Sequence, residues 1–290
     1  MNLKLLYSLH ILIINMANNI MIALANAVSV VNAVANAVAN ATSANASATA
    51  DASASAPPTA NASAPTDASA PAASADSIII SIEGNIGTGK STLLATLKEK
   101  YAADPTIHFM AEPVDVWDTI VDGKGVTILE KYYADQKKYA FSFQMMAYIS
   151  RIAAIRAALK KKYRIIILER SVYTDSAVFA KMLFHDQKIE DIEYMIYMKW
   201  VDEFISDLPP IKFIYVQADP EVSYERVLKR GRAGEVIPLA YLQNCHKYHE
   251  EWLLIENKQP LLLLNANVDT TNEPGTLADW LESIDQFIKV

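Results

Sequence analysis

A glycine-rich segment between an apolar run and a helical pattern constrains the fold of this chain more than any other feature. The apolar run covers 78–82, and behind it come Gly84, Asn85, Ile86, Gly87, Thr88, Gly89, Lys90, Ser91 and Thr92. This segment fits the pattern G-x-x-x-x-G-K-S, in which glycines let the backbone N–H groups surround phosphate oxygens at the start of a helix. The spacing predicts a nucleotide-binding loop in which Lys90 contacts the outer phosphates and the Ser91 hydroxyl ligates Mg²⁺.

The part of the chain that can form a core is shorter than its 290 residues. From Ala17 to Ser77, 24 of the 61 residues are alanine, and the stretch contains neither glycine nor an aromatic residue. Low-complexity sequence of this kind cannot bury enough apolar surface to fold. We therefore predict an unstructured leader at 1–77 and one domain at 78–290, which is long enough for a well-buried core.

The leader has two interpretations. Its first apolar run, 3–14, carries Lys4 and is followed by the small-residue segment Ala23-Leu24-Ala25, as in a secretory signal. The run is too short and too interrupted to span a bilayer comfortably. The interpretation that we favour is a linker-like extension, which predicts a cytoplasmic protein with no membrane partner.

Composition excludes several classes of protein. A single cysteine, Cys245, excludes an intrachain disulfide framework and a multi-cysteine metal cluster. The net charge of −7 argues against general affinity for nucleic acid, because such affinity depends on phosphate neutralisation by Lys and Arg. His246 and His249 have helical i, i+3 spacing, for which helix packing is favoured over a metal pair.

Five continuous apolar runs alternate with helical patterns. The runs lie at 78–82, 107–110, 165–168, 213–216 and 261–264, and the helices are expected at 91–101, 135–161, 190–206, 221–229, 239–256 and 276–288. Continuous runs are typical of strands buried on both faces. The alternation predicts an α/β fold with a five-stranded parallel sheet flanked by helices. Ligands of such folds bind beyond the carboxyl ends of the strands, so functional side chains are expected just after the runs.

Charged residues follow these runs. Glu112 comes after the second run and can serve as a base toward a substrate hydroxyl. Glu169 and Arg170 end the third run, where they can reach Mg²⁺ and neutralise charge at a phosphoryl group. An arginine cluster at a later helix end leads into a loop, as in a mobile lid that closes on a transferring phosphate. The cluster consists of Arg226, Arg230 and Arg232.

Each of these positions also has a simpler interpretation. A strand-end carboxylate is often a solvated turn residue, and an Arg–Glu pair is often only structural. A basic helix end more often complements the helix dipole.

Six segments together resemble the deoxynucleoside kinase family. They are 83–92 (EGNIGTGKST), 112–117 (EPVDVW), 143–151 (FQMMAYISR), 169–175 (ERSVYTD), 230–232 (RGR) and 237–253 (IPLAYLQNCHKYHEEWL). They occur in the family's order and approximate spacing and span essentially all of 78–290. The resemblance implies a P-loop kinase fold with a mobile arginine-bearing lid, ATP as phosphate donor and Mg²⁺ as cofactor. It also implies phosphorylation of the 5′-hydroxyl of a deoxynucleoside by a homodimer formed through the helices at 135–161 and 190–206.

The resemblance further implies roles for individual residues. Glu112 would deprotonate the 5′-hydroxyl, and Arg170 would hold that hydroxyl and the phosphate. Gln144 would pair with the base, while Tyr133 and Glu235 would hold the 3′-hydroxyl. The apolar and aromatic walls around the base would be Trp117, Leu129, Phe143 and Phe179.

Two positions bear on the choice of base. In the family, an Arg/Asp pair at the positions of Arg151 and Asp175 accompanies deoxycytidine and purine deoxynucleosides. The small Ala147 between them also resembles the deoxycytidine kinase pattern. The resemblance therefore implies that deoxycytidine, deoxyadenosine or deoxyguanosine is preferred over thymidine.

The lid departs from the family pattern. Family members commonly have two or more acidic residues after Arg-x-Arg, where this chain has Ala233-Gly234-Glu235. The departure leaves the alignment of Glu235 open. Asp269, after the fifth run, would approach the adenine of ATP.

Two other functions compete with this one. A nucleoside monophosphate kinase shares the phosphate loop but needs extra arginines for the acceptor phosphate. A non-catalytic kinase-like subunit could lose Lys90, Glu112 or Glu169 without penalty, yet all three are present.

Overall fold

The computed structural model describes residues 77–231, 237–268, 270 and 273–289. The predicted leader, apart from Ser77, lies outside these residues, as do three predicted site residues: Arg232, Glu235 and Asp269. Five strands form one sheet in the order β2-β3-β1-β4-β5, and every pairing is parallel. The strands are β1 (Ile78–Glu83), β2 (Ile107–Met110), β3 (Ile165–Glu169), β4 (Ile211–Gln217) and β5 (Leu261–Asn265). The predicted five-stranded parallel sheet is confirmed.

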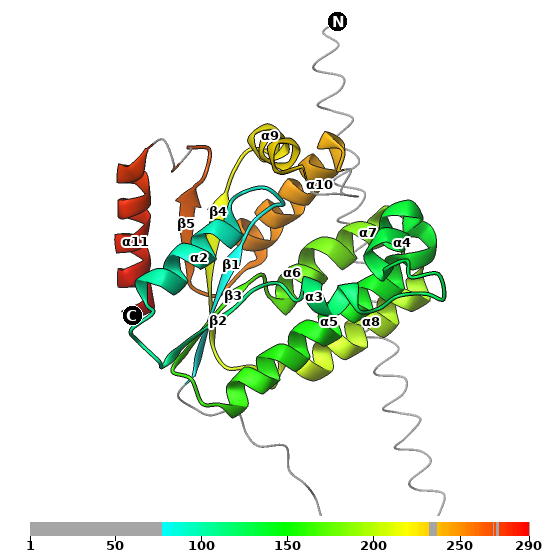
Figure 1. Ribbon diagram of the computed structural model, residues 1–290. Coiled ribbons are helices and arrows are strands. Elements are labelled where there is room, and N and C mark those ends of the chain that lie inside the picture. Colours follow the sequence, from blue (N-terminus) through cyan, green and yellow to red (C-terminus); the bar gives the residue numbers. More distant parts are fainter. Residues whose placement is uncertain (1–76, 232–236, 269, 271–272, 290) are drawn as a thin grey trace, which may run out of the picture. The chain divides into compact units, whose positions relative to one another are not determined.

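Helices cover both faces of the sheet (Figure 1). One face packs against α2 (Lys90–Lys100) and α11 (Pro274–Lys289). The other packs against α5 (Gln136–Lys160) and α10 (Leu239–Glu250), with α8 (Asp191–Ile205) against α5. Along β3, Ile165 and Ile167 enter the first core, and Ile166 and Leu168 enter the second. Burial on both faces explains why the inner strands β1, β3 and β4 read as continuous apolar runs.

The register brings the carboxyl ends of the strands to one edge. Met110 pairs with Leu168, and Ile82 pairs with Glu169. Glu83 pairs with Tyr215 on the other side of β1. The residues that follow β1, β2 and β3 therefore meet at one edge of the sheet, where ligands of this fold class bind.

Each predicted helix is present with its ends shifted by a few residues. The predicted helix at 221–229 is α9 (Pro220–Arg230), and the one at 239–256 is α10 followed by the π-helix η2 (Glu251–Glu256). Five further segments were not expected from the sequence. They are α3 (Val114–Asp118), α4 (Ile128–Ala134), α6 (Val172–Thr174), the π-helix η1 (Asp175–Ala180) and α7 (Lys181–His185).

The start of α4 has a sequence signal that was available. Thr127 accepts a hydrogen bond from the Glu130 N–H at 3.1 Å, and the Glu130 side chain accepts one from the Thr127 N–H at 2.8 Å. This reciprocal capping box satisfies two N–H groups that a helix start leaves without intrahelical partners.

Among the described residues, no helix is both long and apolar enough to cross a membrane.

Candidate active site

The loop after β1 approaches its neighbours so closely that only glycine fits at two positions. A Cβ on Gly84 would lie 2.5 Å from the Val216 carbonyl oxygen, and one on Gly87 would lie 2.4 Å from the Ser223 carbonyl oxygen. Both glycines also have positive φ, 140° and 87°. The loop therefore rests on the end of β4 and on α9, and Gly89 caps the start of α2.

Lys90 is buried inside this loop, with 4% of its surface exposed. Its Nζ donates to the Asn85 carbonyl oxygen at 2.5 Å. Burial, reinforced by the charge of Arg170, lowers the pKa of Lys90 to about 7. An anion beside Nζ would stabilise the charged form of Lys90, so the loop favours the binding of an anion at this position.

Asn85 supports the loop from behind. Its Nδ2 donates to the Leu242 carbonyl oxygen of α10 at 2.8 Å, and its Oδ1 accepts from the Ile86 N–H at 2.8 Å. Neither Asn85 nor Gly84 lines the cavity described below. Both were predicted to bind phosphate, and here they shape the loop that would do so.

Ser91 and Glu169 provide two oxygen ligands beside Lys90. The Ser91 hydroxyl donates to Glu169 Oε1 at 2.7 Å, which joins the first turn of α2 to the end of β3. Hydroxyl and carboxylate oxygens are the ligands that Mg²⁺ prefers, so this pair fits the predicted metal. No group of three or more His, Cys, Asp or Glu side chains suited to a metal occurs in the described part of the chain.

A cavity of about 760 Å³ runs from the loop along this edge of the sheet. It brings together most of the predicted site residues. Those that line it are Ile86, Gly87, Thr88, Gly89, Lys90, Ser91, Thr92, Glu112, Trp117, Leu129, Tyr133, Phe143, Gln144, Ala147, Glu169, Arg170, Asp175, Phe179, Arg226 and Arg230. Arg151 was predicted to contact substrate but lies behind the wall, 3% exposed.

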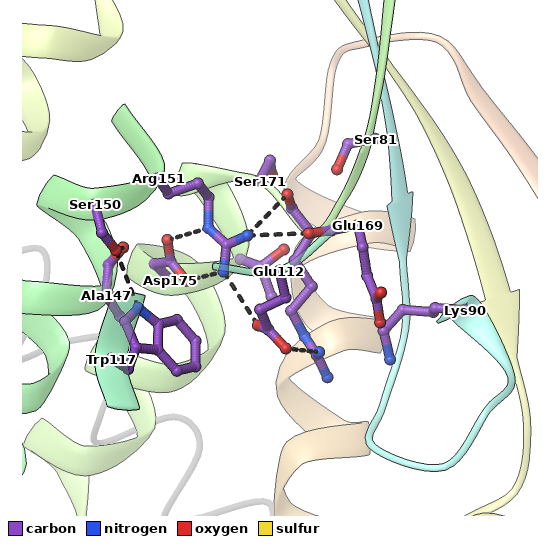
Figure 2. Close-up of polar contacts among 12 residues, drawn as sticks. Ser81, Lys90, Glu112, Trp117, Ala147, Ser150, Arg151, Glu169, Ser171 and Asp175 are labelled. Carbon is purple, nitrogen blue, oxygen red and sulfur yellow. Dashed lines mark hydrogen bonds and ion pairs between the residues drawn. The ribbon is translucent and has the colours of Figure 1, made fainter. Parts of the chain in front are cut away.

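The carboxylate of Glu112 is held by two guanidinium groups (Figure 2). Its Oε1 accepts from Arg151 Nη2 at 3.1 Å, and its Oε2 accepts from Arg170 Nη1 at 3.3 Å. Burial opposes ionisation, but the charges of Arg170, Arg151 and Lys90 together lower the pKa of Glu112. Glu112 is therefore an ionised carboxylate at neutral pH, with an edge on the cavity.

Arg151 joins several parts of the wall, and Figure 2 shows it between Asp175 and Glu112. Its Nε donates to Asp175 Oδ2 at 2.8 Å, and its Nη1 donates to the Glu169 carbonyl oxygen at 3.0 Å. Burial raises the pKa of Asp175, although Arg151 acts in the opposite direction. The guanidinium is thus a fixed support rather than a mobile surface group.

Aromatic rings form the end of the cavity far from the loop. Trp117 meets Phe143 edge to face with centroids 5.3 Å apart, and Tyr132 stacks on Phe143 at 4.6 Å. The Trp117 indole donates to Ser150 Oγ at 3.0 Å, which fixes the ring (Figure 2). These rings line this end of the cavity as an aromatic slot, typical of a site for a planar ring.

Sequence reasoning missed the lining residues Tyr132 and Tyr241. Tyr132 lies on α4, and the Thr127–Glu130 capping box would have placed it on the same helix as Leu129 and Tyr133. Tyr241 lies in the last of the six matching segments but was given no role there.

Segments after β4 and β5 line the cavity on the side of the loop, which rests on the end of β4 and on α9. Arg226 donates to the carbonyl oxygens of Ala266 at 2.8 Å and Val268 at 3.2 Å. It was predicted to bind phosphate, and in this structure it ties α9 to the residues after β5. The remaining lining residues here were also missed, since no motif marks them: Lys229, Ala266, Val268, Thr270, Leu277 and Trp280.

His249 is part of the packing behind the site. It is fully buried, its Nδ1 lies 2.7 Å from the Cys245 carbonyl oxygen, and its ring stacks on Tyr215. Burial lowers the pKa of His249 to about 3, so the ring is neutral.

Comparison with known proteins bears on this arrangement. A family model described as deoxynucleoside kinase matches residues 80–289. A probable deoxycytidine kinase of Fowlpox virus is 36% identical over 217 residues, covering 72% of this chain and 87% of the viral protein. Human deoxycytidine kinase is 33% identical over 240 residues, covering 72% and 90%. A mitochondrial deoxyguanosine kinase of Xenopus laevis is 32% identical over 238 residues, covering 72% and 89%. The predicted family is confirmed: the chain belongs to the deoxynucleoside kinases and is an enzyme of nucleoside phosphorylation.

Proposed function

We propose that this enzyme transfers the γ-phosphoryl group of ATP to the 5′-hydroxyl of a deoxynucleoside, in nucleotide salvage. The observation that carries the proposal is Glu112, an ionised carboxylate held by Arg151 and Arg170 at the cavity edge. The phosphate loop lies at one end of this cavity and the aromatic slot at the other. A nucleoside whose base fills the slot would present its sugar hydroxyl between them.

The acceptor half of the cavity suits an uncharged nucleoside. Trp117 and Phe143, with Leu129 and Phe179, enclose the base, and Gln144 pairs with its edge because an amide both donates and accepts. Tyr133 lines the cavity and binds the 3′-hydroxyl under this proposal, and Glu235, which lies outside the described residues, is proposed for the same hydroxyl. Arg151 is already paired with both Glu112 and Asp175, which disfavours an acceptor that carries a phosphate of its own.

The transfer itself requires alignment and charge stabilisation. The 5′-hydroxyl oxygen attacks the γ-phosphorus while its proton passes to Glu112, and the bond to the bridging oxygen breaks to release ADP. Loop N–H groups and Lys90 hold the phosphates. Arg170, Arg230 and Arg232 neutralise the charge that develops on the transferring group.

Ser91 and Glu169 would hold Mg²⁺. When bound, the ion neutralises phosphate charge and orients the triphosphate. The hydrogen bond between these two side chains brings both oxygens to the same end of the loop as Lys90.

The proposed base preference is deoxycytidine or a purine deoxynucleoside over thymidine. The Arg151–Asp175 pair and Ala147 support this preference. Asp175 adds a polar group to the wall of the cavity, and the apolar 5-methyl group of thymidine would have to contact that wall. The relatives with the names deoxycytidine kinase and deoxyguanosine kinase support it as well.

Turnover of the four deoxynucleosides with radiolabelled ATP tests the proposal, with Glu112→Gln as the matched control. We expect a loss of about 10²–10⁴-fold in kcat for the control, the usual contribution of a general base. Thymidine as the best substrate would contradict the base preference. Equal inactivity of the wild type and Glu112→Gln on every nucleoside would favour a non-catalytic nucleotide-binding role. Phosphorylation of nucleoside monophosphates alone would favour a monophosphate kinase.

A homodimer is also part of the proposal. The helix α8 exposes an apolar face made of Ile192, Met195, Ile196 and Trp200, and Ile149 of α5 is exposed as well. Contiguous exposed apolar faces often mark an interaction surface. Under the same proposal the enzyme acts in the cytoplasm, with 78–290 as its catalytic domain.

A further inference from the structure

A carboxylate that the phosphoryl transfer does not use lies beneath the active site. Glu83 is the last residue of β1, immediately before the loop, and its exposed fraction is 0%. Within the described ranges, Glu83 forms no ion pair with Lys, Arg or His. A buried carboxylate is costly unless hydrogen bonds replace its hydration, so its partners show what it does.

Three hydroxyl groups donate to this carboxylate. Ser81, two residues earlier on the same face of β1, donates to Oε1 at 2.7 Å. Ser171 donates to Oε1 at 2.6 Å, and Thr174 donates to Oε2. Two of the three donors therefore belong to another segment, the one that follows β3.

The segment joined to Glu83 carries the site residues Arg170 and Asp175. Ser171 is the N-cap of α6, but its hydroxyl does not cap that helix and bonds to Glu83 instead. The carboxylate thus lies at the start of the helical run 172–185, where the helix dipole favours a negative charge. Figure 2 labels Ser81, on β1, and Ser171, just after β3.

Arg170 needs such support because its backbone is strained. Its φ is 60°, in the left-handed region that non-glycine residues rarely adopt. Its N–H donates to the Ile82 carbonyl oxygen at 3.0 Å, and its Nη2 donates to the Gly84 carbonyl oxygen at 3.3 Å. Three consecutive residues therefore hold this region. Ile82 binds the backbone of Arg170, Glu83 binds the residues after it, and Gly84 binds its side chain.

We propose that Glu83 is a positioning residue: its bonds to Ser171 and Thr174 hold Arg170 and Asp175 in the geometry in which Arg170 reaches Glu112. Glu83 itself does not line the cavity and acts only through these residues. The proposal rests on the proposed function for its kinetic effect but not for its structural effect. Neither Ser171 nor Thr174 lines the cavity, so both can be changed without touching a ligand.

The test compares three single variants of the full chain. Ser171→Ala and Thr174→Val each remove one bond between Glu83 and the 170–175 segment. Ser81→Ala is the matched control, because it removes an equally short bond to the same carboxylate but leaves the segment attached. We expect Ser171→Ala and Thr174→Val to lower kcat by roughly ten- to a hundredfold, as small misplacements of reacting groups do. The KM for ATP should change by less than about twofold, and Ser81→Ala should retain wild-type kcat.

Hydrogen exchange of the peptide containing 169–175, measured without substrate, separates this proposal from the proposed function. Faster exchange in Ser171→Ala and Thr174→Val, but not in Ser81→Ala, supports positioning even if no nucleoside is turned over. Glu83→Gln should restore most of the activity that Glu83→Ala loses, because hydroxyls can donate or accept. Equal losses of kcat in all three single variants, in proportion to their loss of thermal stability, would overturn the proposal. Unchanged exchange would do so too.

Discussion

Arg151 donates a hydrogen bond to Glu112 at 3.1 Å while the same guanidinium is paired with Asp175. Glu112, the proposed general base, and Asp175, proposed to help select the nucleobase, are therefore held by the same arginine. Changes made at Arg151 to alter nucleoside choice are therefore expected to change the surroundings of Glu112, the proposed general base, as well. Specificity and rate are not independent at this position.

The double change Arg151→Met, Asp175→Ala should admit thymidine but lower the maximal rate. The smaller side chains widen the cavity, and the change also removes one of the two arginines that hold Glu112. Because the charge of Arg151 helps to lower the pKa of Glu112, this pKa should rise. The acid limb of the kcat/KM–pH profile should then move to higher pH. Asp175→Asn, which leaves Arg151 on Glu112, should move the limb little, and an unmoved limb in the double variant would contradict the coupling.

Substitution of two loop glycines should distinguish the cost of backbone strain from the cost of a steric clash. Gly87 and Gly89 both have positive φ, but only at Gly87 would a Cβ meet a neighbour, the Ser223 carbonyl oxygen. Gly89→Ala should therefore cost about 1 kcal/mol of stability from strain alone. Gly87→Ala should cost more, about 2–4 kcal/mol, and weaken ATP binding. Thermal unfolding and ATP titration check this, and equal losses would show that the contact is relieved cheaply.

Burial of Lys90 should make its contribution to stability dependent on pH. Its pKa in the fold is about 7, below its ordinary 10.5, so the unfolded chain binds more protons between these two values. The free energy of unfolding that is due to this group therefore rises with pH across that window. Lys90→Met should be more stable than the wild type at pH 6.5, and this advantage should shrink by pH 9. Urea unfolding of both proteins at each pH measures it, and a constant difference would refute it.

The apolar face of α8 should hold two subunits together. Met195→Glu places a charge on this face and should convert dimers to monomers in sedimentation velocity. Ile255→Glu is the matched control, because Ile255 is also exposed (74% against 66% for Met195) but lies on η2 rather than on α8. Dissociation by both changes, or by neither, would contradict the proposed interface.

The inner strands β1, β3 and β4 were predictable because burial on both faces leaves an uninterrupted apolar pattern. The site followed from them, since parallel register brings Glu112 and Glu169 to one edge whatever the loops do. The run 172–185 was missed because its first helical segment, VYT, has only three residues, and the π-helical turn η1 then interrupts the helical pattern.

Side-chain direction was the other limit of sequence reasoning. Asn85 and Arg226 lie in motifs of the expected kind, yet each donates to a main-chain carbonyl group that is distant in sequence. Local spacing does not encode such partners. Glu83 likewise acquires its function only from Ser171 and Thr174, about ninety residues later (88 and 91).

The central place of β1 in the sheet has a consequence for how this enzyme can be changed. On one flank, β3 and β2 lead to Arg170 and Glu112, next to the acceptor. On the other flank, β4 leads into α9, and Arg226 of α9 donates a hydrogen bond to the segment that follows β5. Under the proposed function, the base of the acceptor would be contacted from the flank of β3 and β2, and the part of the donor beyond its phosphates from the flank of β4 and β5. A library that randomises one flank can be selected for a new nucleoside and then recombined with a library from the other flank selected for a new phosphate donor.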